Sequence, residues 1–275
     1  MTRLKALARD WFPPAMVRWV GQVRGRAGIT FEGDFATWDR ARAQSTGYEA
    51  KEILDKVLAA TLTVKRGEAA FERDSVIFSE IEYVWPVLTG LLWVAARNGG
   101  VLNVLDVGGA LGSSYFQNRK FLNALPEIRW NIVEQAQYVE AGRIHVQDGV
   151  LRFYESIEAC LAENKPNVIL LSSVLQYLEA PREIITQLPR IGASVLLIDR
   201  TPFSTANQDK LVIQRVPASI YEASYSMWIF SMHAFMNRLD TNWRMIASTV
   251  SPEGVIRSTN NLEFSFQGML LESKG

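Results

Sequence analysis

The chain has 275 residues, 48% of them hydrophobic, and its 29 basic side chains are balanced by 29 acidic ones. This length allows one sizeable core with an appendage, or two small domains. Nucleic-acid binders usually carry a basic excess because phosphate neutralisation supplies most of their affinity, so zero net charge favours a small-molecule or glycan substrate. An RNA bound through a local basic patch stays open as an alternative.

Cysteine and histidine are scarce. Cys160 is the single cysteine, and the two histidines, His145 and His233, lie far apart in the sequence. The sequence therefore predicts neither an internal disulfide nor a zinc site. No apolar run reaches the roughly 18 residues of a membrane span. We expect a protein of the reducing cytoplasm.

A basic amphipathic segment, residues 1–30, comes first in chain order. Residues 1–26 carry six basic side chains against one acidic side chain, and apolar residues recur among them at near-helical spacing. Such a segment can lie on an anionic membrane surface, which would make the protein peripheral to the inner membrane. The alternative is a helix packed on its own domain or on a partner subunit. The interrupted apolar stretch does not predict a secretory signal.

Residues 31–100 follow as a mainly helical cap region. Residues 52–62 repeat apolar side chains at helical spacing, and residues 71–96 predict one or two further helices. Asn98, Gly99 and Gly100 form a stop signal after them.

From residue 101 to residue 275, short apolar runs alternate with helical stretches, a pattern that predicts a Rossmann-like α/β domain. Two strand-like runs at the end have no good helix between them, which predicts an antiparallel hairpin on an otherwise parallel sheet of seven strands. The expected strands are 101–107, 130–134, 168–172, 194–199, 243–250 and 262–271, and the expected helices are 113–125 and the stretch from Ser172 through Leu178.

The strongest local signal is the sequence Asp-Val-Gly-Gly-Ala-Leu-Gly that begins at Asp106, after a strand and before a helix. The glycines Gly108, Gly109 and Gly112 let the chain turn sharply and let a ligand approach the backbone. Glu134 ends the next predicted strand, where its carboxylate can accept hydrogen bonds from both hydroxyls of a ribose.

The spacing of these glycines distinguishes between two possible cofactors, a nicotinamide dinucleotide and S-adenosylmethionine. The dinucleotide fingerprint needs glycine at the first, third and sixth positions, but Ala110 and Ser113 occupy the third and sixth positions counted from Gly108. The methyltransferase pattern, acidic-x-Gly-x-Gly-x-Gly, is matched at Asp106, Gly108 and Gly112, with alanine in place of the middle glycine. We therefore expect S-adenosylmethionine as the cofactor.

Several longer stretches resemble a bacterial family that is assigned by inference to the class I, S-adenosylmethionine-dependent methyltransferases. The resemblance implies the methyltransferase fold and cofactor. The family is often encoded near surface-polysaccharide genes, which implies a cell-surface saccharide or its lipid-linked precursor as acceptor. The resembling stretches are residues 67–75, 83–86, 112–118, 130–135, 171–178, 198–203 and 216–225.

Candidate catalytic residues follow from where strands end in this fold, because ligands bind beyond the carboxyl ends of the strands. Asp199 is a candidate base or substrate-orienting carboxylate, unless it forms a structural pair with Arg200. His233 is a candidate base near neutral pH, or a surface histidine. Tyr225 can bind a sugar face, or pack in the core.

Three more residues join the expected cofactor site. Gln135 follows Glu134, and Ser172 ends a predicted strand. Arg73 has the planar fork that suits the methionine carboxylate of the cofactor, although it can also belong to a charge cluster on a helix surface. Two other functions stay open: a non-catalytic binding or scaffold protein on the same fold, and an NAD-dependent oxidoreductase.

Overall fold

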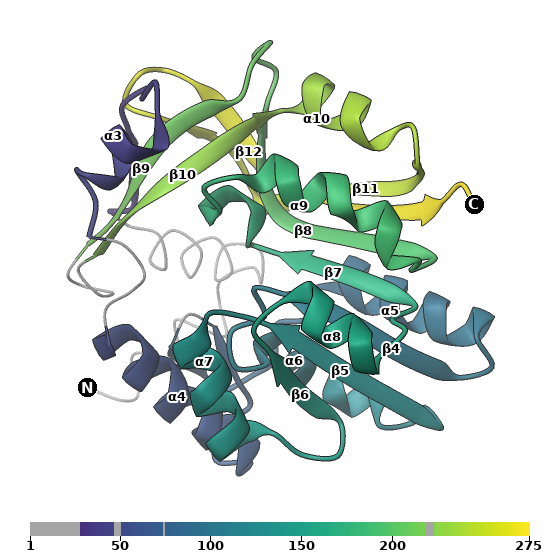
Figure 1. Ribbon diagram of the computed structural model, residues 1–275. Coiled ribbons are helices and arrows are strands. Elements are labelled where there is room, and N and C mark those ends of the chain that lie inside the picture. The colour runs from purple at the N-terminus through teal and green to yellow at the C-terminus, as the bar shows by residue number, and fades with distance from the viewer. Residues whose placement is uncertain (1–27, 47–50, 74, 218–222) are drawn as a thin grey trace, which may run out of the picture.

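The computed structural model describes residues 28–46, 51–73, 75–217 and 223–275. Its centre is a parallel sheet in the order β6-β5-β4-β7-β8 (Figure 1). The chain starts in the middle of this sheet, runs outward to one edge, and then returns to the other side of β4, so a topological switch point lies between β4 and β7. The strands are β4 (Val101–Val107), β5 (Glu127–Val133), β6 (Leu151–Tyr154), β7 (Val168–Ser172) and β8 (Val195–Ser204).

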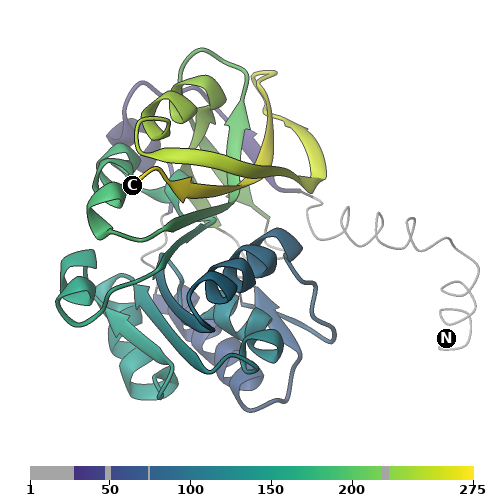
Figure 2. The ribbon, with the colours of Figure 1, turned by 90° about the vertical axis from the view of Figure 1, so that its right-hand side faces the viewer.

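The sheet branches at β8. On one edge of β8 lies β12 (Glu263–Ser273), which is antiparallel to it, and β11 (Trp243–Arg257) pairs antiparallel with β12. This completes the seven-stranded, mainly parallel sheet with a C-terminal antiparallel hairpin, and confirms the predicted Rossmann-like α/β fold. Figure 2 shows that hairpin, in yellow, beside β8.

The other edge of β8 carries β7 first and a second branch afterwards. In that branch β10 (Ala223–Ser231) pairs with the end of β8, β9 (Lys210–Val216) pairs with β10, and β1 (Thr30–Glu32) pairs with β9. The sequence analysis did not predict these three strands. They extend the sheet beyond the carboxyl ends of the parallel strands (Figure 1).

Side chains alternate between the two faces of the central strands, and both faces are buried. Val168 and Leu170 pack in the cluster that includes α4, α5 and α6, whereas Ile169 and Leu171 pack in the cluster that includes α8, α9 and α10. Strands covered on both faces are near-continuously apolar, as these are. The helices are α4 (Lys51–Lys65), α5 (Trp85–Arg97), α6 (Ser113–Leu122), α8 (Ile157–Glu163), α9 (Pro181–Gln187) and α10 (Met232–Leu239).

Residues 31–100, expected as a helical cap, contain α4 and α5 and, near their start, α3 (Trp38–Arg42). The helical prediction for residues 71–78 was wrong. They form a small hairpin of β2 (Phe71–Arg73) and β3 (Val76–Phe78). All three residues of β3 are β-branched or aromatic, which fits a pleated surface better than a helix, and Phe78 of β3 stacks on Phe71 of β2.

Two further expectations need correction. The helix expected through Leu178 is a single 3-10 turn, η2 (Leu175–Tyr177), because Ser173 has a left-handed φ of 56° that interrupts the helix. The strand expected to end at residue 250 continues to Arg257 as β11, through a bulge where the pairing register shifts between Val250 and Val255.

The expected amphipathic segment lies almost wholly outside the described residues, since residues 1–27 are not among them. Within the described part of the chain, no helix is long and apolar enough to cross a membrane.

Candidate functional site

The glycine-rich loop joins β4 to α6 at the carboxyl end of the sheet. Gly108 has a φ of +71° and Gly112 a φ of +99°, both in the left-handed region that favours glycine. A Cβ atom at Gly108 would lie 2.3 Å from Cγ2 of Val174, so no side chain fits there. Ala110, at the middle glycine position of the methyltransferase pattern, also has a left-handed φ, 48°. The loop therefore keeps the glycine conformation at the position where the sequence departs from glycine.

Asp106 lies beneath this loop. Its side chain is 1% exposed, and its Oδ2 accepts a hydrogen bond of 2.9 Å from Nε1 of the buried Trp130. A Cβ at Gly109 would stand 2.5 Å from the same oxygen, which explains why a second glycine follows Gly108. Burial raises the pKa of Asp106 to about 7, against the opposing hydrogen bond from Trp130. Asp106 thus supports the loop from below.

Glu134 follows the last residue of β5 and borders the loop. Its Oε2 accepts a hydrogen bond of 2.6 Å from the backbone N–H of Gln135, and the backbone N–H of Ala110 also donates to its carboxylate. Burial raises the pKa of Glu134, while both backbone hydrogen bonds lower it. The side chain of Gln135 is exposed and accepts a hydrogen bond from Gln137.

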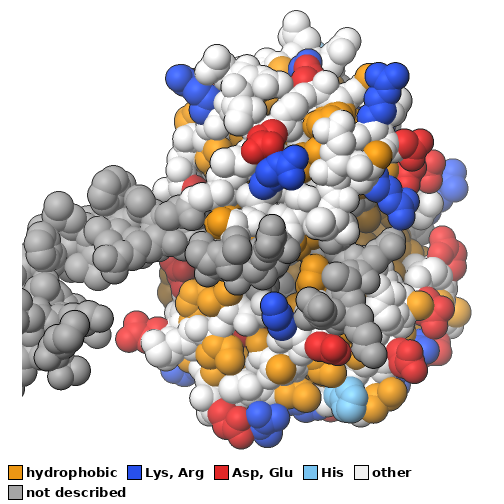
Figure 3. Space-filling model, turned by 90° about the vertical axis from the view of Figure 1, so that its left-hand side faces the viewer, with side chains coloured by type: hydrophobic (Ala, Val, Ile, Leu, Met, Phe, Trp, Pro, Cys, Tyr) orange, Lys and Arg blue, Asp and Glu red, His pale blue; other side chains and the backbone are white. Residues whose placement is uncertain are grey.

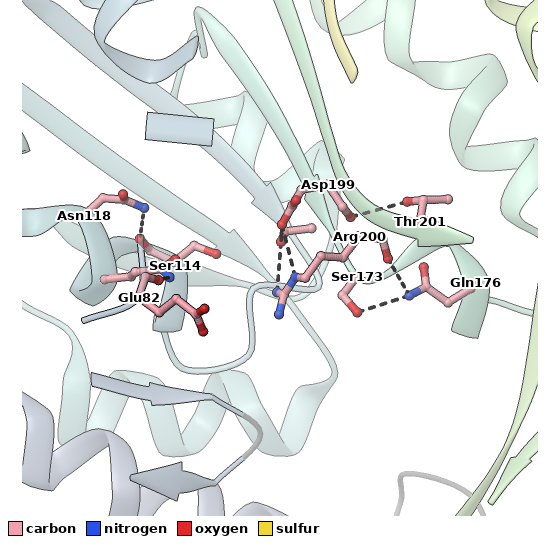
Figure 4. A network of polar contacts seen from close by, with 10 residues as sticks. Glu82, Ser114, Asn118, Ser173, Gln176, Asp199, Arg200 and Thr201 are labelled. Atoms are coloured by element: carbon pink, nitrogen blue, oxygen red, sulfur yellow. Dashed lines mark hydrogen bonds and ion pairs between the residues drawn. The ribbon is translucent and has the colours of Figure 1, made fainter. Parts of the chain in front are cut away.

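Ser172, at the end of β7, forms a hydrogen-bonded triangle with Asp199 and Arg200, in the middle of β8. Figure 4 shows the contact between Asp199 and Arg200. The Ser172 hydroxyl donates to Oδ2 of Asp199 at 2.8 Å, and the Arg200 guanidinium donates to the same oxygen and to Oγ of Ser172, both at 3.1 Å. Asp199 therefore forms the pair with Arg200 that the sequence analysis kept as its alternative.

A bulge shapes this part of β8. Pairing with β12 shifts register between Gln267 and Met269, opposite Asp199 and Arg200. Bulges re-aim side chains and are frequent beside active sites. Arg200 has a left-handed φ of 47° there.

Left-handed residues other than glycine gather at this edge of the sheet. Ala110 follows β4, Ser173 follows β7, and Arg200 lies in β8. Each such residue costs about 1–2 kcal/mol, and strain of this kind concentrates at functional sites. The carboxyl ends of β4 and β7 and the middle of the adjacent β8 thus share one strained region.

Glu72 is a residue that the sequence analysis missed. It is 1% exposed on β2, and the hydroxyl of Ser113, the first residue of α6, donates a hydrogen bond to its Oε1. This contact attaches the hairpin to the glycine-rich loop. The expected residue, its neighbour Arg73, stacks its guanidinium over the ring of Phe71 at 5.4 Å. Only the unexpected hairpin brings Glu72 inward, so helical spacing gave no signal for it.

The other two catalytic candidates lie elsewhere. His233 is exposed on α10, 3.4 Å from Nδ2 of Asn237 in the same helix, and α10 packs on α9 and β10. Tyr225 is 2% exposed, and its ring packs against Tyr177 with centroids 6.1 Å apart. Neither contact joins these residues to the glycine-rich loop.

No cluster of histidine, cysteine, aspartate or glutamate side chains suited to a metal ion occurs among the described residues. Cys160 is buried, and burial raises the pKa of its thiol to about 12. Figure 3 shows basic and acidic side chains interspersed over the described part of one face, in keeping with the balanced charge of the chain.

Comparison with known proteins gives a distant likeness only. No family model and no curated protein matches the chain. The N-terminal domain of EvdMO1, solved with SAH and D-fucose, is 11% identical over 82% of this chain and 100% of that one, with a TM-score of 0.48. The [4+2]-cyclase SpnF is 11% identical over 80% of this chain and 93% of that one, with a TM-score of 0.47.

A third solved structure is the 1,6-didemethyltoxoflavin-N1-methyltransferase of Burkholderia thailandensis, with bound 1,6-didemethyltoxoflavin and S-adenosylhomocysteine. It is 14% identical over 90% of this chain and 100% of that one, with a TM-score of 0.41. At such identities and TM-scores the likeness decides neither the cofactor nor the substrate of this chain.

Proposed function

We propose that this protein is an S-adenosylmethionine-dependent methyltransferase that acts on a small molecule or a glycan. The observation that carries the proposal is the carboxylate of Glu134 beside a glycine-rich loop whose residue 110 keeps a left-handed φ. This pairing lies at the carboxyl ends of β4 and β5, next to the switch point where ligands bind in open α/β sheets.

The donor set suits this cofactor. Glu134 ends its strand with a carboxylate that can accept hydrogen bonds from a ribose diol, and Gly108 and Gly112 keep side chains away from the loop backbone. Asp106 and Glu134 put acidic groups near a cofactor that carries a positive sulfonium. When bound, S-adenosylmethionine supplies a methyl group on that sulfonium, activated for transfer.

The chain's own residues contribute position more than proton transfer. Holding two reactants in line can lower a barrier by several kcal/mol, about 7–11 in well-oriented cases. Oδ2 of Asp199 already accepts hydrogen bonds from Ser172 and Arg200, so taking up a proton at that oxygen would disrupt both bonds. We therefore assign Asp199 the role of orienting Arg200 and Ser172.

A non-catalytic, cofactor-binding protein on the same fold is the second candidate. The engagement of Asp199 with Arg200 favours it, since it occupies the best-placed candidate base. An NAD-dependent oxidoreductase is less well supported, because Ala110 and Ser113 stand where the dinucleotide fingerprint needs glycine.

Calorimetric titration with S-adenosylmethionine and S-adenosylhomocysteine tests the proposal. We expect binding in the micromolar range, weakened about 10- to 100-fold in Glu134→Gln, since a lost charge-assisted hydrogen bond is worth about 1.5–3 kcal/mol. Glu127→Gln, at the exposed start of the same strand, is the matched control and should bind as the wild type does. No binding to the wild type would refute the proposal. Binding without turnover on any acceptor would favour the second candidate.

A surface-polysaccharide precursor as acceptor, with residues 1–26 in peripheral contact with the inner membrane, is a further part of the proposal. It is supported by the sequence resemblance and by the basic excess of that segment. Removal of residues 1–26 should abolish binding to anionic liposomes. Unchanged liposome binding would exclude the membrane contact.

A further inference from the structure

The branch point of the sheet leaves a short stretch of β8 unpaired along one edge. The opposite edge pairs with β12, apart from the bulge at Asp199 and Arg200. On the other edge, pairing with β7 ends at Asp199, and pairing with β10 begins at Phe203. Arg200 is the first residue of β8 in the fork between these two strands.

Arg200 is held there from three sides. Its guanidinium donates to Asp199 and to Ser172, and its backbone carbonyl accepts a hydrogen bond of 3.1 Å from Nε2 of Gln176. Asp199 is 7% exposed and Gln176 is fully buried, so both of these partners are fixed in the core. Figure 4 shows the guanidinium beside Asp199 and turned away from Ser173 and Gln176.

These contacts hold the arginine in an unfavourable backbone conformation. A left-handed residue with a long side chain costs about 1–2 kcal/mol, and glycine would avoid the cost. In this conformation the guanidinium has a fixed orientation, and 26% of the Arg200 side-chain surface is exposed. An immobilised guanidinium loses less freedom when it binds a planar or tetrahedral oxyanion.

The position separates Arg200 from the loop residues that hold the cofactor in the proposed function. The glycine-rich loop follows β4 and Glu134 follows β5, whereas Arg200 lies on the β7–β8 side of the switch point. Its guanidinium nevertheless contacts Ser172, the last residue of β7, and Leu170 of that strand pairs with Asp106 of β4. Arg200 therefore lies at the same edge of the sheet as the glycine-rich loop, across the switch point from it.

We propose that Arg200 binds an oxyanion, a carboxylate or phosphate group, carried by the methyl acceptor. This inference rests on the proposed function and names the class of acceptor, an anionic small molecule or glycan. Ser172, Asp199 and Gln176 are positioning residues that fix the guanidinium. Because Asp199 offsets part of the charge of Arg200, a small free oxyanion binds in the millimolar range, and the rest of the acceptor supplies the remaining affinity.

Titration of the full chain with inorganic phosphate and with acetate, each with and without saturating S-adenosylhomocysteine, tests the inference. We expect phosphate to bind in the presence of S-adenosylhomocysteine and to bind about 10-fold more weakly to Arg200→Gln, as for loss of one charge-assisted contact. Arg200→Lys keeps the charge without the planar guanidinium, so its affinity for phosphate should lie between those of the wild type and Arg200→Gln. Arg129→Gln, which breaks an exposed ion pair at the start of β5, is the matched control and should not change binding.

The inference is overturned if neither phosphate nor acetate binds to the wild type. Phosphate that S-adenosylhomocysteine displaces, together with weaker S-adenosylhomocysteine binding in Arg200→Gln, would assign Arg200 to the carboxylate of the cofactor. If the wild type does not bind S-adenosylhomocysteine, the proposed function fails. Titration of phosphate alone against the same variants then still decides whether Arg200 is an oxyanion site.

Discussion

Gln176 holds Arg200 in its left-handed conformation through the main chain. Its Nε2 donates to the carbonyl oxygen of Arg200 and to Oγ of Ser173, both at 3.1 Å, so one buried amide links the strained residue after β7 to the strained residue within β8. Both residues have a positive φ, 47° and 56°. The strain at this edge is therefore shared between adjacent strands through a single side chain.

The contact between Gly109 and Asp106 gives a direct steric prediction. A methyl group at residue 109 would stand 2.5 Å from Oδ2 of the buried Asp106, and neither the loop nor the carboxyl can move freely. Gly109→Ala should lower the free energy of unfolding by about 1–3 kcal/mol, as overpacking of a close-packed site does. Urea unfolding measures this. Gly149→Ala, where a Cβ meets nothing within 4 Å, is the matched control and should change stability little.

Ala110 tests whether the loop needs its glycine-like conformation. Valine is β-branched and tolerates a positive φ worse than alanine, whereas glycine tolerates it freely. Ala110→Val should lose about 2 kcal/mol of stability and most binding of S-adenosylhomocysteine. Ala110→Gly should bind S-adenosylhomocysteine at least as tightly as the wild type. Tighter binding by the valine variant than by the glycine variant would contradict the role given to the loop.

The buried Asp106 predicts a dependence of stability on pH. Its pKa is raised to about 7 in the folded protein, from 3.8, so between these values the folded state binds the proton that the unfolded state has released. The stabilisation is full below the lower value and is lost as the pH rises through the higher one. Wild-type stability should therefore fall between about pH 4 and pH 7, by at most about 4 kcal/mol from this group, at about 1.36 kcal/mol per pKa unit.

Asp106→Asn separates this effect from the other titrating groups. Asparagine keeps the shape and an oxygen that can accept the hydrogen bond from Trp130, but it has no proton to lose. The stability difference between wild type and variant, measured by urea unfolding at several pH values, should move in favour of the variant as the pH rises. A constant difference would mean that Asp106 is ionised throughout. Glu134, whose pKa burial also raises, is common to both proteins and cancels in the comparison.

The sequence predicted the parallel half of the fold well. β7 begins and ends where its continuous apolar run does, and α6 begins at the predicted residue, Ser113. Both signals are local: a run buried on both faces, and a helix that follows a glycine turn. The cofactor loop was predicted for the same reason, because its glycines are consecutive in the chain.

The rest of the site depends on contacts between distant segments. The fork at β8 exists because β10 pairs with the end of β8, and neither β9 nor β10 was predicted as a strand. Glu72 lies in a hairpin that was assigned to a helix, because short apolar runs fit either structure. The triangle around Arg200 needs a bulge whose register no periodicity reveals.

Glu72 gives the last prediction, because its buried carboxylate attaches the β2–β3 hairpin to the first residue of α6. A carboxylate near a helix N-terminus is favoured by the helix dipole, and its hydrogen bond to Ser113 is charge-assisted. Glu72→Gln keeps the shape but loses the charge, so it should cost about 1–2 kcal/mol of stability and weaken S-adenosylhomocysteine binding through the loop. Glu68→Gln, which removes an exposed ion pair with Arg66 close by in sequence, is the control. Urea unfolding and calorimetry on both variants distinguish the outcomes. Equal, small effects on stability and binding would show that the hairpin is held by its apolar contacts alone. A loss of stability and binding confined to Glu72→Gln would show that its carboxylate supports the loop.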